Sequence, residues 1–126
     1  MSNYLFGNTG VIVILIEYEN KQVKRYFTDY ALMQRKTEHT VIIKKRMDSL
    51  KASVCFNDFL RLGLGKPHLL YGSLANCYGI CITDNVRLIV QPVCQDLSPQ
   101  SLKECEIVVV KGVGDYHGDK INWFIP

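Results

Sequence analysis

The chain has 126 residues, of which 48% are hydrophobic and 21% charged, and it carries a formal net charge of +3. This composition is ordinary for one globular domain spanning residues 1–126. The longest apolar run, Val11 to Ile16, is only six residues, far short of the roughly 20 that a membrane span needs. The N-terminus also lacks the pattern of a signal peptide. We therefore expect a cytoplasmic protein without a membrane partner.

The charge is distributed unevenly along the chain. Between Lys21 and Lys66 there are eleven basic and four acidic residues, a local excess of +7, whereas the remainder has four basic and eight acidic residues. This asymmetry indicates that the first half faces a polyanion or an acidic partner. Solvated faces of two helices are the alternative interpretation, and the sequence leaves both open.

The cysteines and histidines give no sign of a disulfide framework or a metal site. The five cysteines are odd in number and include no C-x-x-C pair, so we expect reduced thiols that pack as small hydrophobic groups. His39, His68 and His117 lie far apart in the sequence without ligand spacing. No metal and no cofactor is therefore expected.

The first half of the chain predicts a strand followed by two helices. The β-branched run Val11–Ile16 is typical of a buried strand. Asn20 can cap a helix, and a second helix is expected from about Glu38 to Lys51. An apolar stripe marks the first helix, at Val23, Tyr26, Phe27, Tyr30 and Met33. The second helix has its apolar face at Ile43, Met47 and Leu50. The two helices together predict a helical hairpin.

The second half predicts mostly strands. Residues 56–66 indicate a short helical turn and a loop, and strands are expected at 68–71, 77–83 and 86–90. Residues 95–104 form a polar insertion, and 106–111 a final strand. Glycines at 112, 114 and 118 are expected to break up the tail. The order β-α-α-β-β-β predicts a two-layer α+β fold, with both helices on an antiparallel sheet of four or five strands.

Arg87 is the first candidate site residue, within the sequence Asn85-Val-Arg-Leu-Ile-Val90. An arginine flanked by β-branched and apolar neighbours occupies one face of a strand, and its planar guanidinium suits bidentate phosphate binding. A cross-strand salt bridge to an acid is the alternative.

The second candidate is the triplet Asp115-Tyr116-His117 between two glycines. Histidine exchanges protons near neutral pH, and aspartate or tyrosine can orient it. An ordinary loop histidine is the alternative here.

These segments also carry a resemblance to a known family. The relevant stretches are Lys44–Ala52, Phe59–His68, Ala75–Ile82, Asn85–Val90 and Asp115–His117. In order and spacing they resemble the RelE/ParE superfamily of toxins, in the HigB-like branch known as plasmid maintenance system killer proteins. The resemblance covers roughly residues 11–117, and it implies the same β-α-α-β-β-β layout.

The resemblance implies the toxin of a type II toxin–antitoxin system, whose partner is a helix-turn-helix antitoxin. Many members are ribosome-dependent mRNA endoribonucleases that need no metal and inhibit translation. Arg87 matches the arginine that holds the scissile phosphate, and Asp115, Tyr116 and His117 match the C-terminal triplet. His117 is then the first candidate for the proton transfers to and from the attacking 2′-hydroxyl and the leaving 5′-oxygen.

The chain departs from the family in one loop. Members usually read Lys-Gly-Asp-x-Lys-Gly where this chain has Tyr71-Gly-Ser-Leu-Ala-Asn76, so both lysines are missing. Tyr71 can instead stack on an RNA base, and Lys66 and His68 lie just upstream to contact substrate. The altered loop equally suits an inactive relative kept as a binding module. A ParE-like toxin that binds DNA gyrase is a further alternative.

Overall fold

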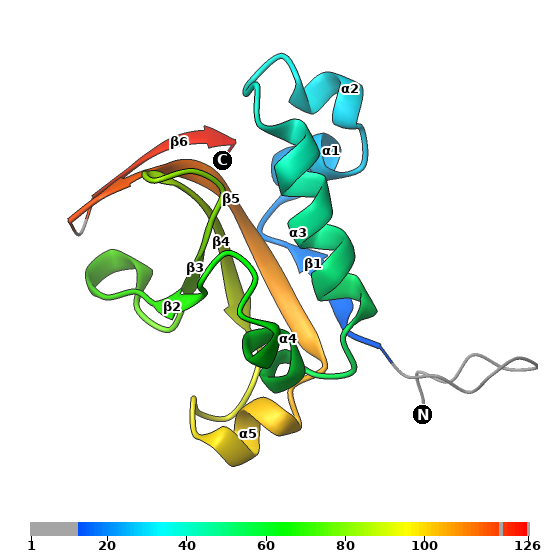
Figure 1. Ribbon diagram of the computed structural model, residues 1–126, viewed down its shortest axis with the longest axis vertical. Coiled ribbons are helices and arrows are strands. Elements are labelled where there is room, and N and C mark those ends of the chain that lie inside the picture. The colour runs from blue at the N-terminus through cyan, green and yellow to red at the C-terminus, as the bar shows by residue number, and fades with distance from the viewer. Residues whose placement is uncertain (1–12, 119, 126) are drawn as a thin grey trace, which may run out of the picture.

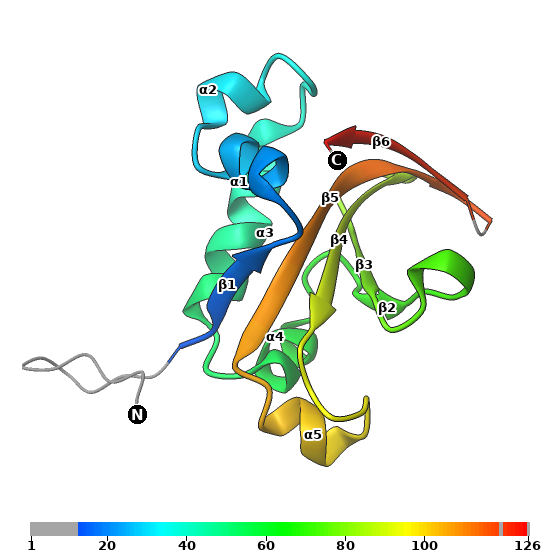
Figure 2. The same cartoon turned by 180° about the vertical axis from the view of Figure 1, so that it is seen from behind.

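The computed structural model describes residues 13–118 and 120–125. It is an α+β fold in which helices cover one face of a six-stranded sheet (Figures 1 and 2). The strands are β1 (Leu15–Tyr18), β2 (His68–Leu69), β3 (Tyr78–Cys81), β4 (Val86–Pro92), β5 (Ile107–His117) and β6 (Lys120–Ile125). The helices are α1 (Lys21–Phe27), α2 (Tyr30–Met33), α3 (Thr40–Ala52), α4 (Phe56–Leu62), the 3₁₀ turn η1 (Gly72–Leu74) and α5 (Pro99–Lys103). The predicted α+β fold class is confirmed, whereas the element order is richer than the predicted β-α-α-β-β-β, with additional helices and a sixth strand.

The sheet has the order β1-β5-β4-β3-β2, with β6 also paired to β5. Strands β2 to β5 are antiparallel neighbours, as expected, but β1 runs parallel to β5. The prediction of a purely antiparallel sheet with four or five strands is therefore wrong. Strands β1 and β6 pair with successive halves of β5: β1 with Ile107–Val110 and β6 with Val113–His117.

Strand β1 lies later in the chain than predicted and is not buried. It covers Leu15–Tyr18, and its side chains alternate between exposed and half-buried. The physical reason is that β1 is an edge strand, which has one hydrogen-bonded neighbour and leaves part of its surface to solvent. Residues 11 and 12 of the predicted strand lie outside the described part of the chain.

The first predicted helix is two helices. Asn20 caps α1 as expected, because its Oδ1 accepts a hydrogen bond from the Val23 amide at 2.9 Å. The apolar stripe continues through Tyr30 and Met33, but the helix ends at Phe27, and Asp29 starts α2 by accepting from the Leu32 amide at 3.1 Å. The apolar stripe indicates only which side chains face the core. It does not show that the helical backbone is interrupted at Asp29, whose side chain caps a new helix.

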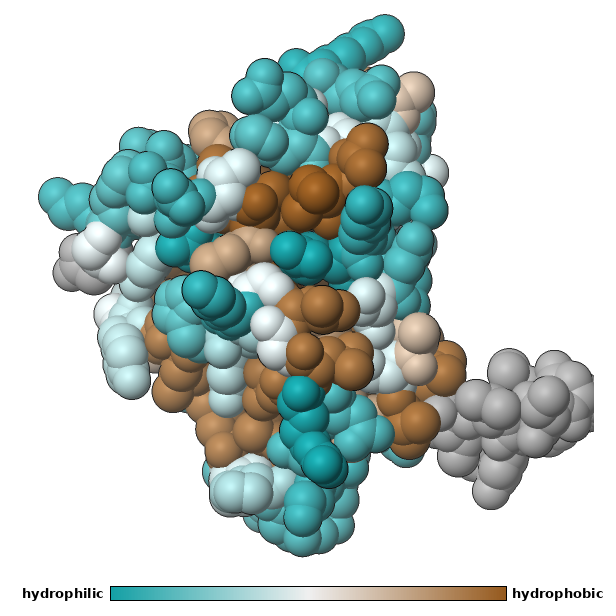
Figure 3. Space-filling model, viewed as in Figure 1, coloured by the Kyte–Doolittle hydropathy of each residue, from teal (hydrophilic) through white to brown (hydrophobic). Residues whose placement is uncertain are grey.

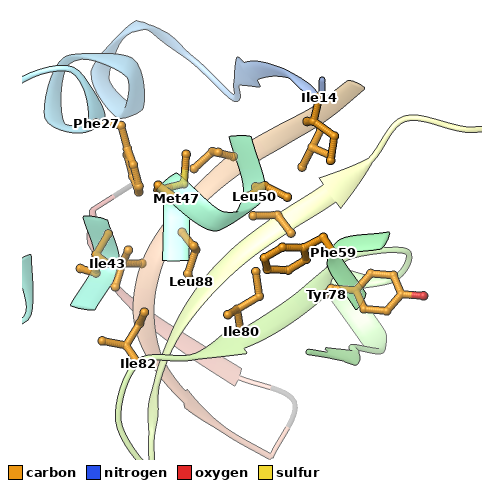
Figure 4. Close-up of a cluster of buried hydrophobic side chains, with 14 of the residues drawn as sticks. Ile14, Phe27, Ile43, Met47, Leu50, Phe59, Tyr78, Ile80, Ile82 and Leu88 are labelled. Carbon is orange, nitrogen blue, oxygen red and sulfur yellow. The ribbon is translucent and has the colours of Figure 1, made fainter. Parts of the chain in front are cut away.

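The main core lies between the helices and the sheet (Figure 4). Ile43, Met47 and Leu50 of α3 are fully buried, as predicted. They pack among side chains of β3 and β4, which include Ile80 and Leu88. Phe56 and Phe59 of α4 join the same cluster, with ring centroids 5.8 Å apart. The helical layer is thus fixed to one face of the sheet.

The tail is ordered by the long strand β5, contrary to prediction. β5 runs through Gly112 and Gly114 and forms a hairpin with β6. A Cβ at Gly112 would collide with the Ile125 carbonyl oxygen, and one at Gly114 would lie 2.7 Å from the Asn122 carbonyl oxygen. Gly112 also has φ +145°. These glycines permit close backbone approach in the sheet, where the sequence suggested breaks.

The other face of the sheet, turned away from α1 and α3, is called here the outer face. Its residues follow from strand alternation and cross-strand register: His68 on β2, Gly79 and Cys81 on β3, Arg87 and Ile89 on β4, and Gly114 and Tyr116 on β5. A small second cluster covers its centre, with Leu70, Leu74, Cys77 and Ile89 buried together and Tyr116 and Ile121 packed against them.

The surface of the molecule is mixed in polarity. Figure 3 shows hydrophilic side chains along the upper rim and at the lower tip of the view, with apolar surface between them. Exposed apolar side chains include Leu62 and Leu64 at the end of α4. Among the described residues, no helix is long and apolar enough to cross a membrane.

Candidate functional site

Arg87 lies on the outer face near the start of β4. It stands opposite Cys81 of β3 and Gly114 of β5, while its neighbours Val86 and Leu88 point into the main core. The β-branched and apolar neighbours thus hold the strand in place, as the sequence suggested, and the arginine itself is half-buried.

The Arg87 guanidinium is held by backbone carbonyl oxygens. Nη1 donates to the Thr83 carbonyl at 2.8 Å and to the Val86 carbonyl at 3.3 Å. Nε is buried and has no hydrogen-bond partner among the described residues. No carboxylate of the described part of the chain lies within ion-pair distance of Arg87, so the cross-strand salt bridge is not found there. The guanidinium is therefore fixed in direction, and no carboxylate of the described residues balances its positive charge.

Tyr116 shares the outer face with Arg87. Its amide donates to the Asn85 carbonyl at 2.9 Å, which places it diagonally across from Arg87 on the neighbouring strand. Such diagonal neighbours lie within reach of long and aromatic side chains. The side chain of Tyr116 packs against the small outer cluster.

Asp115 and His117 form a pair on the opposite side of β5. The His117 Nε2 and Asp115 Oδ1 atoms are 2.7 Å apart, although the contact lacks the alignment of a hydrogen bond. Because Asp115 stands opposite the core residue Val86, both side chains face away from Arg87. The His117 side chain is 64% exposed and that of Asp115 33%. The triplet lies within β5 rather than in a loop, and only Tyr116 faces Arg87.

His68 is the histidine that shares Arg87's face. It pairs with Gly79 across β2 and β3, and a Cβ at Gly79 would lie 3.7 Å from Arg87 Cδ. Its Nδ1 lies 3.1 Å from the Lys66 carbonyl oxygen. Since a carbonyl only accepts, this contact favours the tautomer with the proton on Nδ1 and a free lone pair on Nε2. Lys66 itself is exposed, with φ +46°.

Residues 71–76 form the 3₁₀ turn η1 with its flanks, between β2 and β3. Leu74 is buried in the outer cluster, whereas Tyr71 is left 69% exposed. The segment therefore covers part of the outer face with apolar side chains. The exposed ring of Tyr71 is available to stack on a ligand.

The basic residues of the first half lie mainly on the helical side. Lys21, Lys24, Arg25, Lys44 and Lys45 are exposed on α1 and α3. Few are paired: Lys44 contacts Asp48 at 3.0 Å, and Lys36 lies 5.8 Å from the centre of the Tyr26 ring. This positive surface and Arg87 belong to opposite faces of the sheet.

No group of three or more His, Cys, Asp or Glu side chains suited to a metal ion occurs among the described residues. All five cysteines are unpaired, as predicted. Burial raises the pKa of the Cys105 thiol to about 11 and also raises the pKa of Cys77. These two thiols are consequently protonated near neutral pH and suit packing rather than nucleophilic chemistry.

Lys111, Trp123 and Glu19 were not predicted as site residues, although they lie together beside η1. These three residues are close together because β1 and β6 both pair with β5. No periodicity or short motif in the sequence encodes such a long-range arrangement.

No protein-family model and no curated protein matches the chain. Two solved structures are similar in fold: the YoeB-YefM complex from Staphylococcus aureus and the heterotetrameric YoeB-YefM toxin–antitoxin complex from the same organism. In each the match has a TM-score of 0.49 and 18% sequence identity, and covers 83% of this chain and 98% of the other chain.

Proposed function

We propose that this chain is the toxin of a type II toxin–antitoxin pair and that it cleaves mRNA on the ribosome. The observation that carries the proposal is the Arg87 guanidinium, fixed by two backbone carbonyls and left without a carboxylate partner in the described chain. An arginine in this state suits a phosphate, whose oxygens accept from the remaining N–H groups. The sequence resemblance to HigB-like toxins supports RNA as the source of that phosphate.

The proposed reaction uses the substrate's own 2′-hydroxyl. A base takes its proton, the oxygen attacks the adjacent phosphorus, and the bond to the 5′-oxygen breaks as that oxygen receives a proton. The products are a 2′,3′-cyclic phosphate and a new 5′-hydroxyl end. Arg87 stabilises the negative charge that develops on the phosphate oxygens.

The residues on Arg87's face are the first candidates for proton transfer. His68 has its Nδ1 at the Lys66 carbonyl and its Nε2 free, so it can accept the 2′-hydroxyl proton. Tyr116 lies diagonally across from Arg87 and can orient the substrate or donate to the leaving oxygen. His117 and Asp115 face the other side of β5, and a direct role for them requires substrate to reach around the end of the strand.

Tyr71 and Lys66 contact parts of the RNA that do not take part in the reaction. Tyr71 offers an exposed ring for base stacking, and Lys66 an exposed ammonium for the RNA backbone. The positive surface of α1 and α3 then contacts ribosomal RNA, and a helix-turn-helix antitoxin is the inhibitory partner. The protein works in the cytoplasm, without a metal or cofactor.

The deciding experiment is induced expression followed by mapping of mRNA 5′ ends. New in-frame 5′-hydroxyl ends support the nuclease. Growth arrest without new ends, accompanied by changed plasmid supercoiling, supports the gyrase-binding alternative. Absence of both effects supports a binding module without activity.

A further inference from the structure

Trp123 of β6 lies on the outer face, in the same cross-strand row as Arg87. Arg87 stands opposite Gly114, and Gly114 stands opposite Trp123. Neighbouring strands are spaced about 4.8 Å apart, so the Cα atoms of Arg87 and Trp123 lie roughly 10 Å from each other. Gly114 has no side chain, and Ile121 leans over it, because a Cβ there would lie 2.7 Å from Ile121 Cγ1. The surface between the arginine and the tryptophan is therefore apolar.

The indole of Trp123 is unusually open and borders a small cavity. A Cβ at Gly112 would lie 3.0 Å from Trp123 Cζ3, so the ring rests against this glycine. Trp123 is nevertheless 39% exposed, although a side chain of this size is usually more covered. The cavity beside it has a volume of about 260 Å³, and Ser73 and Leu74 of η1 also line it. Pockets for whole ligands begin at roughly 300 Å³, so this one suits a single planar ring system.

The two ends of this row differ in charge. In the cavity, Lys111 Nζ lies 3.0 Å and 3.1 Å from the two carboxylate oxygens of Glu19, so the two charges balance each other. Because both oxygens are engaged by the lysine, the pair offers no free edge that distinguishes one base from another. At the other end, no carboxylate of the described residues lies within ion-pair distance of Arg87. An apolar, neutral end beside a cationic end matches a nucleotide, whose base is uncharged and whose phosphate is anionic.

We propose that the Trp123 indole stacks on one unpaired base of a single-stranded nucleic acid, with little preference among the four bases, while Arg87 binds a phosphate of the same strand. Every base has a π-face, and aromatic side chains beside cations are the usual platform for single strands. The exposed ring of Tyr71 is a second such side chain on this side of the molecule. That the strand is RNA rests on the proposed function, whereas the stacking of a base on Trp123 does not.

Trp123 is the one tryptophan of the chain, so its fluorescence reports directly on the indole. The full chain is titrated with heptamers of A, C, G or U that carry 2′-O-methyl groups and therefore cannot be cleaved. All four should quench the fluorescence saturably, with affinities within roughly tenfold of one another. Heptamers in which a single abasic position is moved along the strand should reveal one position where loss of the base weakens binding by roughly tenfold.

Substitutions show whether that base stacks on Trp123, with binding measured by the anisotropy of labelled heptamers. Trp123→Leu should weaken binding of the intact strands by roughly tenfold and should remove the effect of the abasic position, because the two changes delete the same contact. Trp123→Phe should retain part of the affinity. Phe124→Leu is the matched control, since this neighbouring aromatic packs against the main core, and it should bind like the wild type.

A purely structural role of Trp123, as a filler over Gly112, gives a different result. It predicts a lower melting temperature for Trp123→Leu with wild-type affinity for the heptamers, and that outcome would overturn the proposal. Absence of saturable quenching by all four heptamers, an abasic scan without a sensitive position, or a preference of more than roughly hundredfold for one base would also overturn it.

Two comparisons separate this inference from the proposed function. Tighter binding of the 2′-O-methyl heptamers than of DNA heptamers assigns the site to RNA, whereas equal binding supports a stacking site for single strands of either kind. If Trp123 binds a base but expression of the chain gives no new mRNA 5′ ends, the stacking site stands and the nuclease proposal fails. If new ends appear and Trp123→Leu binds the heptamers like the wild type, the nuclease proposal stands and the stacking site fails.

Discussion

Tyr116 lies on the same face of the sheet as Arg87, two positions along β5 from Gly114, the residue directly opposite Arg87. His117, the next residue, points to the other face and contacts Asp115. A continuous triplet in the sequence is therefore divided between two surfaces. This division makes His68, which is remote in sequence but shares Arg87's face, a stronger candidate for proton transfer.

The role of Arg87 can be tested by substitution. Arg87→Ala should reduce RNA cleavage by roughly 10²–10³, because a preorganised positive contact to the transition state is lost. Arg87→Lys should restore only part of the rate, since an ammonium cannot form the bidentate contact. Thermal melting should show a folded protein in both cases, because Val86 and Leu88 still pack in the core. A folded and fully active Arg87→Ala protein would refute the assignment.

The two histidines should respond differently. His68→Gln is expected to lower the cleavage rate by roughly 10²-fold or more, the usual contribution of general acid–base catalysis, while RNA binding is retained. His117→Gln should lower it by less than about tenfold, because its side chain faces away from Arg87. Single-turnover cleavage and RNA binding, measured for both variants, separate catalysis from affinity. A larger loss of cleavage rate in His117→Gln than in His68→Gln would indicate that His117 of the triplet, and not His68, transfers the proton.

A cation added to η1 should strengthen activity. Ala75 is exposed and stands where the HigB-like toxins resembled by this chain usually have a lysine. Ala75→Lys is expected to raise the cleavage rate by about tenfold at low salt, and the gain should shrink as salt screens the charge. Ala52→Lys, which adds the same charge at the exposed end of α3, is the control. An equal effect of both substitutions would point to a general charge effect instead.

Tyr30 gives a prediction about stability. Its hydroxyl is buried without a hydrogen-bond partner in the described chain, and burial, with the nearby Asp48 and Tyr18, raises its pKa to about 12. The folded state therefore keeps this proton between about pH 10 and 12 while the unfolded chain loses it, so the contribution to stability falls as pH rises through that range. Tyr30→Phe should remove this pH dependence and raise the free energy of unfolding by up to about 1 kcal/mol at neutral pH. Urea unfolding of both proteins at pH 8 and pH 11 measures the two effects, and an unfolding free energy that drops at pH 8 in Tyr30→Phe would contradict them.

How much of this could be predicted from the sequence depends on the range of the interactions involved. The cap at Asn20, the buried face of α3 and the strand position of Arg87 follow from local patterns, and all three were predicted. The break at Asp29 was missed, because the apolar stripe continues across two separate helices.

The errors in the tail have a different cause. Gly112 and Gly114 suggested an irregular end, but their missing side chains allow β6 to approach β5 closely. The parallel pairing of β1 with β5 joins residues about 90 positions apart. The candidate site shows the same difference between local and long-range interactions. Arg87 and Tyr116 were predicted one by one from local patterns. That they share a face with His68 depends on the register of four strands, which local patterns do not determine.

The most direct test is to map mRNA 5′ ends in cells that express the wild-type chain or Arg87→Ala at equal levels. The account predicts new in-frame cleavage sites with 5′-hydroxyl ends for the wild type, and their absence for the variant. Growth arrest by the wild-type chain without new ends, or identical ends with Arg87→Ala, would contradict it.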